Sequence, residues 1–74
     1  MPHSQEDLIQ FMANGGHLDL KVSHRTQQDL VQLAAIAKKH DARIILRDVG
    51  KKRTADLVQI AANAPDKVTF VIDD

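Results

Sequence analysis

The 74-residue sequence contains no cysteine, no tryptophan and no tyrosine, and it has only two phenylalanines. Without cysteine the chain can form neither disulfides nor thiolate metal sites, so the usual stabilisers of a very small domain are excluded. The scarcity of aromatic rings removes the stacking platforms that single-stranded nucleic acids use. We therefore expect a single small domain over residues 1–74 that gains stability by associating with other copies.

Long apolar runs and a net charge are missing as well. No segment approaches the ~20 apolar residues of a membrane span, and the first residues lack the pattern of a secretion signal. Ten basic side chains balance ten acidic ones, which argues against broad attraction to nucleic acid or membrane. The expectation is a cytoplasmic protein that does not bind a membrane. The charges are unevenly spread, because residues 23–54 hold eight basic side chains against three acidic ones.

The sequence does contain one short motif three times: Asp-Leu, an aliphatic residue, Gln, and then apolar residues. The copies begin at Asp7, Asp29 and Asp56, so their spacings are 22 and 27 residues. Each copy follows a Ser or Thr suited to a helix N-cap and precedes a short apolar stretch. The pattern predicts three helix-strand units over about residues 4–23, 26–48 and 54–74, with Ser4, Thr26 and Thr54 as caps.

The apolar residues of the three expected strands alternate with polar ones, which is typical of a sheet with one buried and one open face. A doubly wound sheet, covered on both faces, would need strands that are apolar throughout. We therefore predict an α/β fold with a three-stranded parallel sheet in the order 1-2-3, helices on one face and the other face open. The side chains expected to face the helices are Leu18, Leu20, Val22, Ala42, Ile44, Leu46, Val68, Phe70 and Ile72.

Residues 56–72, DLVQIAANAPDKVTFVI, resemble a circularly shifted α/β leucine-rich repeat, in which a leucine-containing helix precedes a strand with alternating apolar residues. The resemblance covers most of residues 26–74. It departs from the family because the Asn or Cys ladder beyond the strand is missing, with Asp48 and Asp73 near those positions. It implies a binding scaffold that uses its open sheet face.

The open sheet face is the first candidate site. With Val22, Leu46 and Ile72 side by side, one row of this face would hold Lys21, Ile45 and Val71. Cross-strand pairs Asp19–Arg43 and Arg47–Asp73 would offset each other's charge. Two aliphatic side chains within a charged rim suit a protein interface, so the expected contact residues are Ile45, Val71, Arg43, Arg47 and Lys21. An unpaired edge strand offers another route to association.

The strand-to-helix loops are the alternative site. They emerge at one edge of the sheet and gather cations at helix N-termini, where free N–H groups favour anions. A phosphate or nucleic acid would then contact Arg25, Thr26, Lys51, Lys52, Arg53 and Thr54. The other interpretation is a solvated loop whose threonines cap the helices, since no glycine-rich phosphate cradle is present.

Catalytic and metal-binding residues are not expected. The four histidines make no recognised ligand spacing, and Ser23, His24 and Asp48 contain the residue types of a triad without its geometry. The repeated Gln10, Gln32 and Gln59 are expected to bond to a neighbouring helix or loop, or else to form a polar helix surface. The sequence thus favours a non-enzymatic interaction module without cofactor, working as a homodimer, with another protein as a possible partner.

Overall fold

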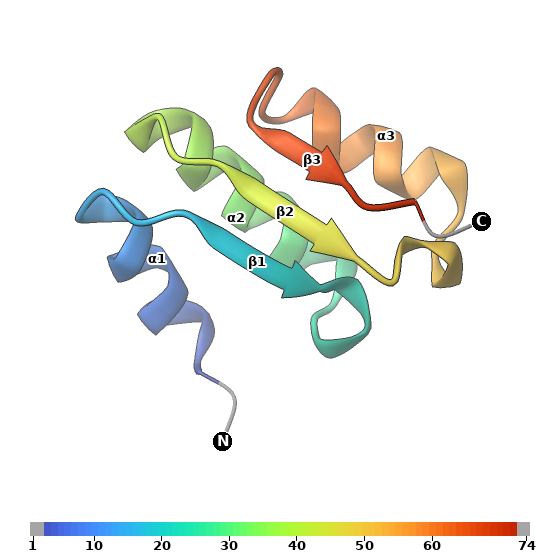
Figure 1. Cartoon of the computed structure of the whole chain (residues 1–74), viewed down its shortest axis with the longest axis horizontal. Coiled ribbons are helices and arrows are strands. Elements are labelled where there is room, and N and C mark those ends of the chain that lie inside the picture. The colour runs from blue at the N-terminus through green and yellow to red at the C-terminus, as the bar shows by residue number, and fades with distance from the viewer. Residues whose placement is uncertain (1–2, 73–74) are drawn as a thin grey trace.

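The computed structural model describes residues 3–72 and contains three helix-strand units, as the sequence predicts. Helices and strands alternate along the chain, and a single 3₁₀ turn joins each of the first two strands to the next helix (Figure 1). The elements are α1 (Gln5–Ala13), β1 (Leu18–Lys21), η1 (Val22–His24), α2 (Gln27–His40), β2 (Ile44–Arg47), η2 (Val49–Lys51), α3 (Thr54–Ala62) and β3 (Val68–Phe70).

Two of the three helices begin at the expected caps. The Ser4 hydroxyl accepts the Asp7 N–H at 3.1 Å, and the Thr26 hydroxyl accepts the Asp29 N–H at 3.2 Å. The prediction that Thr54 caps α3 is wrong. Arg53 is the last residue with extended backbone and makes no side-chain cap bond, so Thr54 is already the first helical residue. The helix therefore begins one residue earlier than the pattern of the other two units indicates.

The residues that end α1 and α2 adopt a left-handed backbone conformation or allow two backbone segments to approach closely. After α1, Gly15 has φ +94°, and Gly16 donates its N–H to the Phe11 carbonyl at 2.8 Å. A Cβ on Gly16 would lie 2.8 Å from that same oxygen, so only glycine fits without a shift of the backbone. Helix α2 ends at Asp41, which adopts the left-handed conformation at φ 56°.

The sheet is parallel with the order β1-β2-β3, and all three helices lie on one of its faces (Figure 1). This confirms the predicted fold. The register differs from the expectation, because Leu20 rather than Val22 lies beside Leu46, and Leu46 lies beside Phe70. Val22 has left the strand to form η1, so β1 ends at Lys21 and the chain turns toward α2 one residue earlier than expected.

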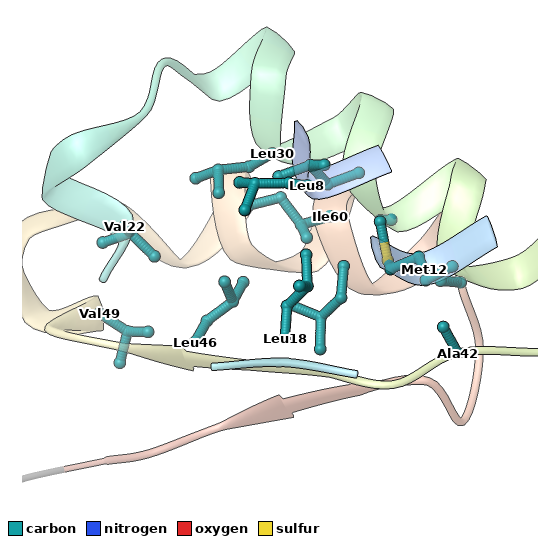
Figure 2. Close-up of a cluster of buried hydrophobic side chains, with 14 residues drawn as sticks. Leu8, Met12, Leu18, Val22, Leu30, Ala42, Leu46, Val49 and Ile60 are labelled. Carbon is teal, nitrogen blue, oxygen red and sulfur yellow. The ribbon is translucent and has the colours of Figure 1, made fainter. Parts of the chain in front are cut away.

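The core lies between the helices and the inner face of the sheet, as Figure 2 shows. Its largest fully buried side chains come from all three helices, from β2 and from η1: Met12, Leu30, Leu33, Ile44, Leu46, Ile60 and Val22. Burying one such aliphatic side chain contributes roughly 1.5–3 kcal/mol. No buried polar or charged residue interrupts this core within residues 3–72.

The third strand is the least covered. Val68 and Phe70 are half-buried, and Ile72, which was expected to face the core, is 59% exposed. Strand β3 forms one edge of the sheet, and no further helix lies beyond α3 in the described part of the chain. The inner face of β3 is therefore only partly covered by the helices. Over residues 3–72, none of the helices has the length and apolar character needed to span a membrane.

Candidate functional site

The open sheet face is mostly charged. Lys21, Arg43 and Arg47 are exposed on it, whereas Ile45 and Val71 are half-buried. The observed register places Ile45 between Asp19 and Thr69, and it places Lys21 beside Arg47. The expected row of Lys21, Ile45 and Val71 is therefore wrong, because β1 and β3 are each displaced by two residues relative to β2.

The same displacement changes the ion pairs of the open face. Asp19 pairs with Arg47 rather than with Arg43, through a two-fold contact of 2.7 Å (Nε to Oδ1) and 3.0 Å (Nη2 to Oδ2). These hydrogen bonds hold the pKa of Asp19 below its usual range and raise that of Arg47. Arg43 instead donates to the Asp66 carbonyl at 3.3 Å. The predicted Arg47–Asp73 pair lies outside the described residues, because Asp73 is not among them.

A second ion pair closes the opposite end of the open face. Lys67 donates to the Asp41 carboxylate, and this bond is the main reason why the pKa of Asp41 is lowered. The nearby charge of Arg43 lowers that pKa further. His17 is itself held by the sheet, since its Nδ1 accepts the Arg43 N–H at 2.9 Å. Most charges of this face are thus satisfied within the chain.

The basic loops predicted to bind anions do come together, because η1 and η2 lie side by side at one end of the sheet (Figure 1). Their cations are largely engaged, however. Arg25 is half-buried and donates to the His3 carbonyl and, at 3.5 Å, to Gln5 Oε1. The Thr26 hydroxyl is used as the cap of α2.

The cations of η2 also have acidic neighbours. Lys51 contacts Asp48 at 3.3 Å, and Arg53 contacts Asp56 at 3.4 Å. Both pairs are between near neighbours in sequence and are exposed, so each stabilises little and can exchange for another anion. Lys52 is half-buried beside them. Within residues 3–72, no group of three or more metal-ligating side chains is found.

A ladder of glutamines joins the helices. Gln5 of α1 donates to Gln32 Oε1 of α2 at 2.9 Å and to the Asp29 carbonyl at the same distance. One unit further on, Gln27 of α2 makes the equivalent bonds to Gln59 and to the Asp56 carbonyl of α3, again at 2.9 Å. The expected structural role of Gln32 and Gln59 is confirmed.

The donors of this ladder were not anticipated. Gln5 and Gln27 each lie two residues before the repeated Asp, a spacing that is visible in the sequence. In the third unit the same position is Thr54. At both junctions the earlier helix donates and the later helix accepts. We call the side of a helix that corresponds to the accepting side of α2 its accepting side, and the side that corresponds to the donating side of α2 its donating side. The outermost accepting side belongs to α1, and the outermost donating side belongs to α3.

The accepting side of α1 forms a shallow groove of about 460 Å³, which we call the α1 groove. It is lined by Asp7, Gln10, Phe11, Asn14 and Gly16. The equivalents of Asp7 and Gln10 in the later helices accept hydrogen bonds from the preceding helix: Asp29 and Gln32 in α2, and Asp56 and Gln59 in α3. Phe11 is 43% exposed, whereas its counterparts Leu33 and Ile60 are 0% and 1% exposed. Its ring meets that of His3 edge to face, with centroids 5.3 Å apart.

The donating side of α3 forms a larger groove of about 540 Å³ between this helix and β3, which we call the α3–β3 groove. Its lining is almost entirely apolar and includes Leu57, Val58, Ala61, Phe70 and Ile72. Val58 and Ile72 are each 59% exposed. The sequence alone did not indicate this site, because Val58 occupies a helix position that packs against the core in the other units.

Comparison with protein-family models, with curated proteins and with solved structures gave no match. The repeated units and the parallel sheet therefore rest on the sequence and the structure of this chain alone.

Proposed function

We propose that the protein is a self-associating interaction module without catalytic activity, and that its main contact surface is the α3–β3 groove. The observation that supports this most strongly is the exposure of Val58 and Ile72 in one apolar hollow. Two large aliphatic side chains more than half exposed in a domain of this size favour a covered state, because burying them adds to a small core.

The electrostatics of the molecule support the same choice. The open face carries charges that already pair within the chain, including the two-fold Asp19–Arg47 contact. Very few polar groups line the α3–β3 groove, so a partner would displace little hydrogen-bonded water from it. Covering the groove therefore has a small desolvation cost, whereas covering the open face would bury several charges.

Sedimentation velocity over a range of protein concentrations tests the proposal. We expect the parent protein to associate as its concentration rises, and Val58→Lys to remain monomeric at the same concentrations. Ala55→Lys is the matched control, because Ala55 is exposed on the same helix and does not line the groove. A parent protein that stays monomeric throughout, or a Val58→Lys variant that associates equally well, contradicts the proposal.

Three finer predictions from the sequence belong to this proposal. A homodimer in the cytoplasm is the simplest setting for such a module. The resemblance to α/β leucine-rich repeats would make it a short scaffold of that type. The predicted contact through Ile45 and Val71 is the alternative to the α3–β3 groove, because it would place the interface on the open face.

Binding of phosphate groups at the basic loops stays the alternative function. The exposed Lys51–Asp48 and Arg53–Asp56 pairs would have to open for an anion to enter. A salt titration on an oligonucleotide distinguishes the alternatives, because binding to phosphates weakens as salt rises. Binding that persists when Arg25, Lys51, Lys52 and Arg53 are all replaced by Ala contradicts this alternative.

A further inference from the structure

The two grooves correspond to the two sides of the helix–helix contact that occurs twice within the chain, between α1 and α2 and between α2 and α3. Where α1 meets α2, the donating side of α1 packs against the accepting side of α2, and the α2–α3 contact repeats this arrangement. The α3–β3 groove is a third donating side, and the α1 groove is a third accepting side. Neither is covered by any described residue of the chain.

The helix positions of the two grooves agree with this assignment. Val58 and Ala61 of α3 correspond to Ile9 and Met12 of α1, which pack into the core beside α2. Phe11 of α1 corresponds to Leu33 of α2, which is fully buried. Each terminal helix thus exposes apolar residues at positions that the neighbouring units cover.

From this correspondence we infer that the occupant of the α3–β3 groove is the α1 groove of a second copy of the chain, in a head-to-tail arrangement. This inference rests on the proposed self-association and specifies its geometry. Phe11 of the second copy enters the groove beside Val58 and Phe70, as its counterpart Leu33 lies within one chain in the buried cluster that contains Leu8 and Met12 of α1. Such a contact is not self-complementary, so it leaves one groove free at each end and can add further copies.

The sheet continues across the same contact. Leu18 lies beside Ile44, and Ile44 lies beside Val68, so the next strand in this series is β1 of the second copy. Leu18 of that copy would lie beside Val68, and Leu20 beside Phe70. The unpaired edges of β3 and β1 would then satisfy each other's backbone N–H and carbonyl groups.

The glutamine ladder stops at this junction. The accepting pair of the incoming α1 is Gln10 Oε1 and the Asp7 carbonyl, but α3 offers Thr54, whose shorter side chain cannot reach both. Thr54→Gln supplies the missing donor. Two added hydrogen bonds should strengthen the association about fivefold or more, since each contributes a modest net free energy and the two add.

Mixing two blocked variants tests the inference. Val58→Lys removes the α3–β3 groove, and Phe11→Lys removes the α1 groove. We expect each variant alone to be monomeric, with its self-association at least about tenfold weaker than that of the parent, because a buried apolar contact is replaced by a charge. An equimolar mixture should form a dimer and nothing larger, because one intact junction remains.

The controls separate this inference from the proposed function. Ala13→Lys, on an exposed α1 position outside the α1 groove, should associate like the parent. Gln10→Lys is a second blocking variant, which serves if Phe11→Lys does not fold. If Phe11→Lys and Gln10→Lys associate as the parent does while Val58→Lys does not, self-association stands and the head-to-tail geometry is wrong. A parent protein that never associates overturns both proposals.

Salt dependence gives an independent reading. The first unit and the third unit both carry a net negative charge, so their approach is opposed by repulsion. Raising the salt concentration screens this repulsion and also favours apolar burial. We expect head-to-tail association to strengthen with salt. Association that weakens with salt would show that attraction between charges, and not the two grooves, holds the copies together.

Discussion

Replacing Lys52 by Arg should stabilise the protein, because it gives a partner to a buried acceptor. Gln27 Oε1 is buried and has no hydrogen-bond partner among the described residues. In the preceding unit, the equivalent Gln5 Oε1 accepts from Arg25 Nη1 at 3.5 Å. Arg25 is the C-cap residue directly after η1, and Lys52 is the C-cap residue directly after η2. Lys52→Arg therefore reproduces in the second junction a contact that exists in the first.

The size of the effect follows from the cost of an unpaired buried acceptor, which is about 1–3 kcal/mol. The Arg25–Gln5 bond is long, so the gain should lie near the lower limit, at about 1 kcal/mol. For a domain of this length, such a change in the free energy of unfolding raises the melting temperature by roughly 4–8 °C.

Thermal and urea unfolding followed by circular dichroism measure this gain. Lys51→Arg, one residue earlier, is the matched control and should leave the stability unchanged. Lys52→Arg should also have no effect in a Gln27→Leu background, because the acceptor is then absent. An equal gain with and without Gln27 would refute the reasoning, since the stabilisation could not come from that oxygen.

Three further predictions concern the core, the open face and one helix end, and urea unfolding measures each of them. Leu33→Ala, in the fully buried centre, should cost about 2–5 kcal/mol of stability. Asp19→Asn should destabilise the protein at neutral pH, and the difference from the parent should vanish as the pH falls through the lowered native pKa of Asp19. Gly16→Ala should destabilise by about 1 kcal/mol or more, because its Cβ meets a backbone oxygen; Gly50→Ala, with no atom within 4 Å, is its control.

Each of these predictions has a contrary outcome. A Leu33→Ala variant as stable as the parent would mean that the core is not packed as described. The Asp19 difference has a definite sign, because a carboxylate with a lowered native pKa stabilises the fold above its unfolded pKa of about 3.9 and loses that effect in acid. A difference that grows on acidification contradicts the Asp19–Arg47 pair. Equal stability of Gly16→Ala and Gly50→Ala contradicts the tight helix end.

The architecture could be predicted because two periodicities determine it. The strict alternation of apolar and polar residues in the strands allowed only one buried sheet face. The motif that occurs three times located the helices. The register could not be predicted to the residue. Val22 continues the alternation of the first strand perfectly, yet it leaves the sheet for η1, since the chain must turn there to reach α2. Local alternation carries no information about where that turn begins.

The candidate site could not be predicted from single strands and loops, because it depends on which side chains the neighbouring units cover. Ile45 and Val71 stand out in the sequence as aliphatic residues on a polar face, but their neighbours leave them half-buried. Val58 occupies a position where the other units pack, and only the end of the stack exposes it. Aligning the three units would have located the donors Gln5 and Gln27, and would have marked Thr54 as the place where their ladder stops.

Amide chemical shifts, recorded by NMR while the parent protein is diluted, test most directly whether the copies join through the two ends of the stack. The shifts of the residues that line the α1 groove and of those that line the α3–β3 groove should change together, with one dissociation constant, while those of Ile45 and Arg47 stay constant. Changes confined to the open sheet face, or to only one of the two ends, would contradict the account.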